Sequence, residues 1–173
     1  MATGCAGDAT TLDSGGAADA GADAGSGGEA GGGGNDPQLP PLGQAALEPW
    51  LAAGHYLAWR CEDRIFPMRL NGAHGRHRIC SNALVIETPV RAGTAYPVGA
   101  ASVKELFDTM DRPNGFAVGV KIAPGLGDAT WYWYERIGRL ATLSPVADGI
   151  GVRACGPQCH AAAPHDNVFL RAP

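Results

Sequence analysis

The chain has 173 residues, 17 of them acidic and 13 basic, and a formal charge of −4 at pH 7. Residues 1–38 hold six acidic residues and no basic one, so the rest of the chain carries a charge of about +2. This near balance lacks the basic stripe that nucleic-acid binding requires, and no run of 18 apolar residues predicts a membrane-spanning helix.

Residues 1–41 are predicted to form a disordered tether. Twelve of the first 34 residues are Gly, and this stretch holds one Leu and no aromatic residue. It therefore cannot bury enough apolar surface to offset the entropy of ordering. Cys5 follows small residues, as the lipid-receiving cysteine of a bacterial lipoprotein does, and we expect a lipid on it. The alternative is an ordinary cysteine in an unstructured tail. A folded domain is expected over residues 42–173.

Residues 44–59 are predicted to form one or two short helices, because Pro49 and Gly54 interrupt an otherwise helical pattern. The segment from 60 to 82 is rich in Arg, Gly and His without periodicity, and is predicted to be irregular surface structure. The side chains that recur every four residues on the helical face are Leu47, Leu51, His55 and Trp59.

The remainder is predicted to be mainly β, an antiparallel sheet with a few short helices. β-Branched or aromatic runs bounded by Gly and Pro predict strands at 82–88, 95–108, 115–124 and 129–138. A Gly-Leu-Gly-Asp connection joins the last two as a hairpin. Alternation places Trp131 and Trp133 on one face of the last strand and two tyrosines on the other. Both faces of that strand are therefore expected to be covered.

A pair of cysteines followed directly by histidine lies near the C-terminus, at Cys155, Cys159 and His160. We interpret it as a Cys-x-x-Cys-His signature of c-type haem attachment, although three residues separate the cysteines here where that signature has two. In such a segment each sulfur adds to a haem vinyl group and the histidine becomes an axial ligand of the iron. A loop leading into a short helix is expected there. The alternatives are a redox cysteine pair, which lacks a βαβ context, and half of a zinc site.

Cys61 and Cys80 are predicted to form a disulfide, since c-type haem is attached outside the cytoplasm, where thiols oxidise. On the chain-entropy model, closing this loop would add about 3 kcal/mol to the free energy of unfolding. The alternative is a pair of buried thiols. The 19-residue separation of these cysteines also argues against their completing a zinc site with the C-terminal pair.

The ligand opposite His160 is expected to be absent, which leaves an open iron position and favours ligand binding or catalysis over simple electron transfer. His165 is too close to His160 in sequence to cross the haem plane, and His55 belongs to the helical face. The candidates that stay open as a sixth ligand are His74 and His77, whereas the turn-like surroundings of Met68 and Met110 make them poor choices.

Several short motifs occur in an order that resembles the cytochrome P-460 family, including its relatives the cytochromes c′-beta. They are "YPVGAASVKELF" (96–107), "WYWYE" (131–135), the cysteine–histidine segment (155–160) and "HDNVF" (165–169). The resemblance covers about residues 95–173. It implies a mostly antiparallel β fold, often dimeric, that holds one pentacoordinate c-type haem with His160 as axial ligand.

The resemblance also implies roles for individual side chains. In the name-giving members the lysine of a Val-Lys-Glu motif is bonded to the haem macrocycle, and Lys104 is the matching residue. Without the resemblance, Lys104 would be interpreted as a solvent-facing strand lysine on the same face as Ser102 and Leu106. A distal carboxylate accepts protons in those members, and Asp128 and Glu135 are the nearest candidates for it. Phe169 is expected to supply an apolar wall of the cofactor site.

These features together predict an exported c-type monohaem cytochrome, located in the periplasm or cell envelope and tethered through Cys5. It would bind or oxidise hydroxylamine or nitric oxide and pass electrons to a soluble partner cytochrome. If it is an enzyme, the expected activity is that of a hydroxylamine-oxidising oxidoreductase. The alternatives are a non-enzymatic nitric oxide binding or sensing module and a six-coordinate electron-transfer cytochrome.

Overall fold

The computed structural model describes residues 39–68, 74–89, 91, 93–169 and 172. Cys5 and nearly all of the predicted tether lie outside these residues. The helical elements are α1 (Gln44–Ala52), η1 (His55–Ala58), α2 (Ala83–Glu87), η2 (Asp128–Thr130) and η3 (His160–Ala162). The strands are β1 (Arg60–Cys61), β2 (Arg76–Ser81), β3 (Ala101–Phe107), β4 (Pro113–Lys121), β5 (Trp131–Ile137) and β6 (Ala147–Ile150).

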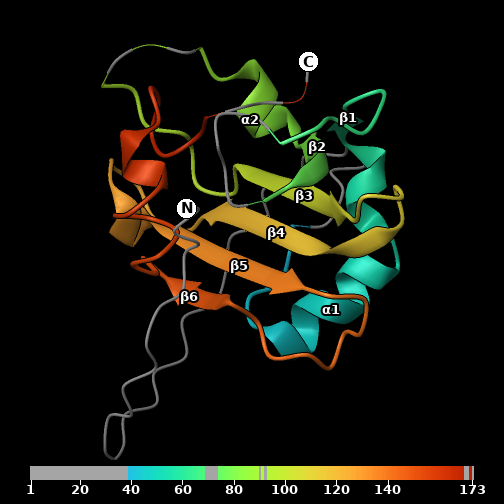
Figure 1. Ribbon diagram of the computed structural model, residues 1–173. Helices are drawn as coiled ribbons and strands as arrows, with labels where there is room; N and C mark the ends of the chain where they lie inside the picture. The colour runs from blue at the N-terminus through green and yellow to red at the C-terminus, as the bar shows by residue number, and fades with distance from the viewer. Residues whose placement is uncertain (1–38, 69–73, 90, 92, 170–171, 173) are drawn as a thin grey trace, which may run out of the picture.

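The strands of the described residues form one antiparallel sheet in which spatial order follows chain order, from β1 at one edge to β6 at the other (Figure 1). Each strand is paired antiparallel with the next strand of the chain, the arrangement expected of consecutive antiparallel strands. The prediction of a mainly β chain with an antiparallel sheet and a few short helices is therefore confirmed.

One predicted strand, 82–88, is wrong, because this segment forms the helix α2. The side chain of Asn82 accepts a hydrogen bond from the backbone N–H of Val85 at 3.2 Å, which caps the first turn. The amide of Asn82 also donates to the carbonyl of Gly99 at 2.7 Å. Val85 is fully buried under the sheet. The cap and this buried contact outweigh the strand preference of the β-branched residues.

The prediction of irregular structure over residues 60–82 is also wrong in part, because β1 and β2 lie there. Cys61 and Cys80 are directly opposed across these two strands and form the predicted disulfide. β2 then pairs along its whole length with β3. Charged and histidine side chains hide the strand pattern of β2 in the sequence, although Ile79 and Cys80 are buried.

The face of the sheet that is covered by α1 and η1, which we call the helical face, holds the larger apolar cluster. The predicted short helices are present as α1 and η1, separated at Gly54, which has a positive φ of 71°. No helix of the described segments is long and apolar enough to cross a membrane. The buried members of this cluster are Leu47, Trp50, Leu51, Tyr56, Trp59, Cys80, Ala101, Val103, Val118, Val120, Tyr132 and Tyr134.

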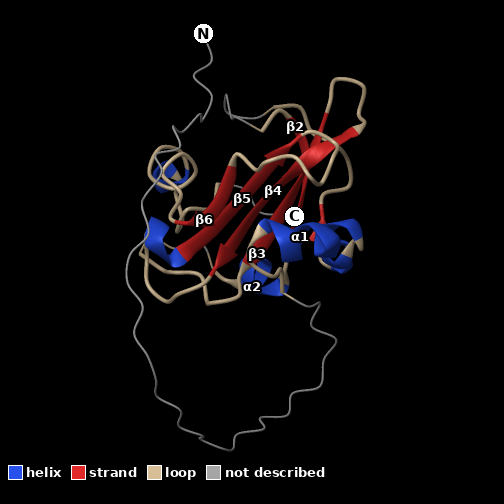
Figure 2. Cartoon of the chain, turned by 90° about the horizontal axis from the view of Figure 1, so that it is seen from below, coloured by secondary structure: helices blue, strands red, loops and turns tan. Residues whose placement is uncertain are grey.

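The opposite face carries a second cluster, and we call it the tryptophan face. Trp131 and Trp133 lie on it, while Tyr132 and Tyr134 belong to the helical face, as the alternation predicts. Val85 of α2 and Cys155 of the C-terminal segment pack against the two tryptophans. Figure 2 shows the helices and loops that surround the strands. The aromatic strand β5 is therefore covered on both sides.

Candidate cofactor site

The segment from Cys155 to His160 folds as a run of wide turns that lead into η3, as predicted. The backbone N–H of His160 donates to the carbonyl of Cys155 at 2.8 Å, across five residues. In a Cys-x-x-Cys-His signature the same two positions are four residues apart, which is the spacing of an α-helical hydrogen bond. The extra residue between the two cysteines is thus accommodated by a wider, π-type turn.

Cys155 and Cys159 are thiols at the edge of the tryptophan face. Cys155 is 8% exposed and belongs to the cluster of Trp131 and Trp133, whereas Cys159 is half-buried. The structure therefore brings the chemistry-bearing end of the chain onto the sheet face that lacks α1.

His160 is held in a single tautomer by a part-buried hydrogen bond. Its Nδ1 lies 2.7 Å from the backbone carbonyl of Asn167, to which it can only donate, so Nε2 carries the lone pair that a metal requires. Burial lowers the pKa of His160 to about 4, against the raising effect of the Asn167 carbonyl. The imidazole is therefore neutral at pH 7. Its ring centroid is 4.3 Å from that of Trp133.

The carbonyl of Asn167 is positioned by a tight turn over residues 165–168. Asp166 and Asn167 both have positive φ, a conformation that Asp and Asn tolerate better than other residues. The carboxylate of Asp166 is fully buried and pairs with Nζ of Lys121 at 2.8 Å. It also accepts from the backbone N–H of Tyr96 at 2.8 Å. This network fixes the turn that orients His160.

Asp128, a candidate distal carboxylate, lies beside the cysteine loop. Its Oδ1 accepts a hydrogen bond from the side-chain amide of Asn167. A Cβ placed on Gly156 would meet the side chain of Asp128 at 2.8 Å, so the two segments touch. These contacts describe a structural role for Asp128 at the base of the loop.

Lys104 and Glu135 face the same side of the sheet as Trp133. Lys104 on β3 is opposite Ala117 on β4, which is opposite Glu135 on β5. Directly opposed residues of antiparallel strands project to one face, so the two charged side chains stand on either side of the small Ala117. Lys104 is half-buried, and its charge contributes to lowering the pKa of His160.

Glu135 is only 3% exposed, and it pairs with His74. Its Oε1 lies 3.0 Å from Nδ1 of His74. The His74 ring centroid is in turn 6.3 Å from that of His160. Phe169 completes the surroundings, with its ring 5.6 Å from His160 and 39% of its surface exposed.

The other predicted candidates lie elsewhere. His55 is exposed and contacts Trp50 on the helical side. His165 is buried against Tyr96. His77 is buried with Nδ1 bonded to the carbonyl of Gly75. Met68 and Met110 are 57% and 63% exposed. Of the two histidines left open by sequence, His74 is therefore the one that contacts His160.

Within the described ranges no three His, Cys, Asp or Glu side chains are grouped as ligands for a bare metal ion. A structural zinc site would need four such ligands and a catalytic one three. The structure brings His74 next to His160 and places Cys155 beside Trp133. Sequence reasoning left His74 as one of two candidate histidines and did not single out Asn167. The contribution of Asn167 is a backbone carbonyl, which no side-chain pattern signals.

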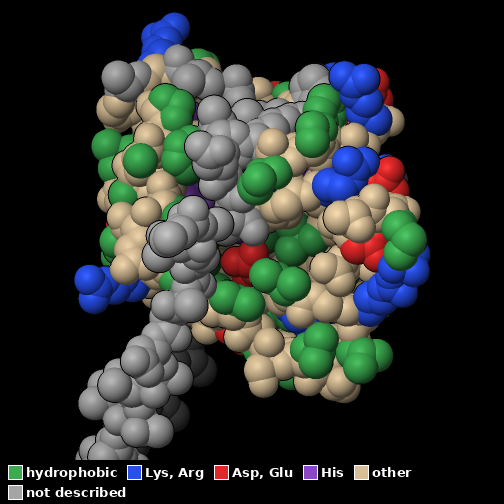
Figure 3. All heavy atoms as spheres, viewed as in Figure 1, with side chains coloured by type: hydrophobic (Ala, Val, Ile, Leu, Met, Phe, Trp, Pro, Cys, Tyr) green, Lys and Arg blue, Asp and Glu red, His purple; other side chains and the backbone are tan. Residues whose placement is uncertain are grey.

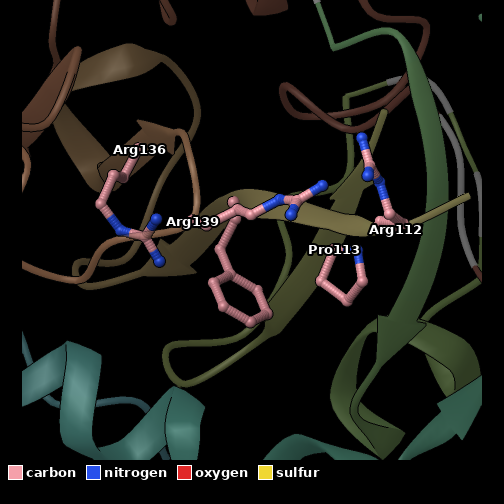
Figure 4. A pocket seen from close by; sticks show the side chains of 6 residues that line it. Arg112, Pro113, Arg136 and Arg139 are labelled. Carbon is pink, nitrogen blue, oxygen red and sulfur yellow. The ribbon is translucent and has the colours of Figure 1, made fainter. Parts of the chain in front are cut away.

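A separate hollow of about 270 Å³ lies where β4 begins and β5 ends (Figure 4). Three arginines line it, but each pairs with a carboxylate: Arg112 and Arg139 with Asp108 at 2.8 Å, and Arg136 with Glu48 at 2.5 Å. Basic and acidic side chains also lie next to one another on one side of the molecule in Figure 3. The three guanidinium groups share two carboxylates, so the hollow keeps a formal excess of one positive charge but no unpaired arginine. Its lining residues are Arg112, Pro113, Gly115, Phe116, Arg136 and Arg139.

Comparisons of the chain with protein-family models, with curated proteins and with solved structures gave no match. The resemblance to the cytochrome P-460 family therefore depends on the short sequence motifs alone.

Proposed function

We propose that this protein is an exported c-type monohaem cytochrome, similar to the cytochrome P-460 family, that binds or oxidises a small nitrogen species. Cys155 and Cys159 would bind the haem covalently and His160 would be its axial ligand. The observation that carries the proposal is the state of His160: it is neutral, its Nδ1 donates to a fixed carbonyl, and it follows the cysteine loop directly. Axial histidines are oriented by such a bond.

Two further observations support the fit of a planar aromatic cofactor. The indole N–H of Trp133 is buried without a hydrogen-bond partner beside His160, and a buried donor normally has one. The residue between Lys104 and Glu135 on the tryptophan face is the small Ala117, which takes up little space beside the two charged side chains, while the Trp133 ring covers Gly119. When bound, the haem iron would supply the redox change and the coordination position for a nitrogen ligand.

The side chains around that position would handle protons and charge. Glu135 and His74 form a hydrogen-bonded pair that can accept a proton. The oxidation of hydroxylamine to nitric oxide releases electrons and protons in equal number, so a one-electron acceptor, a soluble partner cytochrome, is required together with this base. Lys104 stands on the same face and is the residue that would form the family's bond to the haem edge.

Expression in a host with a c-type haem maturation system tests the proposal directly. We expect the intact mass to rise by one haem per chain, and Cys155→Ser with Cys159→Ser to abolish covalent attachment while the disulfide of Cys61 and Cys80 stays intact. Purified protein that folds, is exported and never carries covalent haem would contradict the proposal. The absorption spectrum of the denatured protein then reports whether Lys104 is cross-linked, with Lys104→Arg as the comparison.

The reaction class is decided by assays on the haem-loaded protein. Tight nitric oxide binding together with hydroxylamine-dependent reduction of an acceptor cytochrome supports an enzyme. Nitric oxide binding without turnover supports the binding or sensing module instead. Glu135→Gln should lower turnover without lowering nitric oxide affinity, because the change removes a base and leaves a hydrogen-bonding group of the same size.

The remaining expectations become part of the proposal. A lipid on Cys5 would tether the protein in the periplasm or cell envelope, and intact mass of native protein lacking a diacylglycerol on Cys5 would reject it. Members of the family are often dimeric, so we expect a homodimer. Light scattering of the haem-loaded protein would measure its molar mass in solution.

A further inference from the structure

The contact between His74 and His160 carries an inference about the position opposite the axial ligand. The sequence predicted that position to be open, yet His74 is the imidazole that the structure brings next to His160, with ring centroids 6.3 Å apart and planes tilted by 55°. His74 lies two residues before the start of β2, while His160 comes from the C-terminal segment of the chain.

Both rings are prepared for coordination in the same way. Nδ1 of His160 donates to the Asn167 carbonyl at 2.7 Å, and Nδ1 of His74 lies 3.0 Å from the buried Oε1 of Glu135. Metal-binding histidines characteristically donate their second ring N–H to a carboxylate or a backbone carbonyl. A carboxylate accepts from Nδ1–H, which leaves Nε2 of His74 with its lone pair. Glu135 is held on β5, so it fixes the orientation of the ring.

The separation of the rings also fits ligation. Metal–imidazole nitrogen bonds are about 2 Å long, so two imidazoles on opposite sides of one iron have centroids about 6 Å apart. The distance of 6.3 Å between the ring centroids of His74 and His160 already matches this value. A histidine that served only as a proton acceptor above a bound ligand would have to stand farther away, because the ligand itself occupies the intervening space.

We propose that His74 is the second axial ligand of the resting haem, positioned by Glu135, and that a small nitrogen ligand binds by displacing it. This rests on the proposed haem attachment. One coordination bond, His74 Nε2 to iron, breaks and one bond from the incoming nitrogen forms, with no net electron transfer. The displaced imidazole stays hydrogen-bonded to Glu135 and becomes the base next to the ligand.

The spin state of the haem-loaded protein tests this. Wild-type ferric protein should be six-coordinate and low-spin with the electron paramagnetic resonance signature of two imidazoles. His74→Ala should become high-spin, and added imidazole should restore the low-spin spectrum, which shows that the variant is folded around an intact site. His55→Ala, which removes an exposed histidine on the helical side, should leave the spectrum unchanged.

Ligand binding gives the second readout. In the wild type only the fraction of molecules in which His74 is displaced can bind the ligand, and the apparent affinity is reduced by that fraction. His74→Ala should therefore bind nitric oxide on the order of 10- to 100-fold more tightly than wild type. Glu135→Ala should produce a mixture of spin states, whereas Glu135→Gln, which still accepts from Nδ1, should stay largely low-spin.

Three results separate the two proposals. A chain that never acquires covalent haem overturns the proposed function and this inference with it. Covalent haem that is high-spin in the wild type overturns the inference alone. A low-spin wild type whose spectrum is unchanged in His74→Ala also overturns it, because another residue would then be the ligand.

Discussion

Replacing Asp166 with alanine should destabilise the protein by about 3–5 kcal/mol, the usual cost of removing one partner of a buried ion pair. Asp166 and Lys121 are both fully buried, and their charged atoms are 2.8 Å apart. Asp166 also accepts from the backbone N–H of Tyr96 and, at 3.3 Å, from the indole of Trp131. The change therefore removes the counter-charge of one buried cation and the acceptor of two buried donors.

The lower part of that range is expected, because Lys121 keeps two other acceptors. Its Nζ donates to the carbonyl of Gly125 and to Oγ1 of Thr130, both at 2.6 Å. Urea unfolding of the full-length protein, followed by tryptophan fluorescence and circular dichroism, measures the loss. With a slope of about 1–3 kcal/mol per molar urea, a loss of about 3 kcal/mol lowers the midpoint by about 1 M or more.

Two comparison variants make this measurement decisive. Asp63→Ala removes an exposed carboxylate and should change stability by less than about 0.5 kcal/mol. Asp166→Leu combined with Lys121→Met replaces the pair with apolar groups, and should be less destabilised than the sum of the two single variants. A loss below about 1 kcal/mol for Asp166→Ala, or strict additivity in the double variant, would refute the reasoning.

Three further changes have defined outcomes. Replacing Cys61 and Cys80 with serine should lower the free energy of unfolding by about 3 kcal/mol, seen as a lower urea midpoint that reductant no longer changes. Gly119→Ala should cost about 1–3 kcal/mol and shift tryptophan fluorescence, because its Cβ would lie 2.8 Å from the Trp133 ring; unchanged stability would contradict the close contact. Hydrogen bonds, led by a backbone N–H of the following turn, hold the pKa of Asp108 well below its usual range. Its contribution is therefore present at neutral pH and is lost as the pH falls below about 4, so Asp108→Asn should be less stable than wild type at pH 7, with a difference that narrows in acid.

Much of the fold was accessible from local pattern. The four-residue spacing on 44–59 predicts α1 and η1, and the alternation of Trp and Tyr in β5 predicts which ring lies on which face. The cysteine pair and the adjacent histidine predict where the site lies along the chain. The first two inferences hold because helix and strand periodicity depend on residues that are close in sequence. The haem attachment stays part of the proposal.

The failures have a common cause in long-range contacts. The run 82–88 has strand-forming composition, yet Asn82 caps it and Val85 is buried as part of a helix. The segment containing β2 lacks an apolar alternation, yet it pairs with β3 and is closed by the disulfide. In each case tertiary contacts override a local preference that amounts to less than about 1 kcal/mol per residue.

The sequence by itself determined the mainly β class and the disulfide pair, and it singled out Cys155 to His160 as the segment on which the proposed haem attachment rests. Only the tertiary structure decided what surrounds His160. The pairing of His74 with Glu135 joins residues 61 positions apart, and the row of Lys104, Ala117 and Glu135 depends on the register of three strands. Register is set by packing of the whole sheet, since a slip of one residue would turn each of these side chains to the other face.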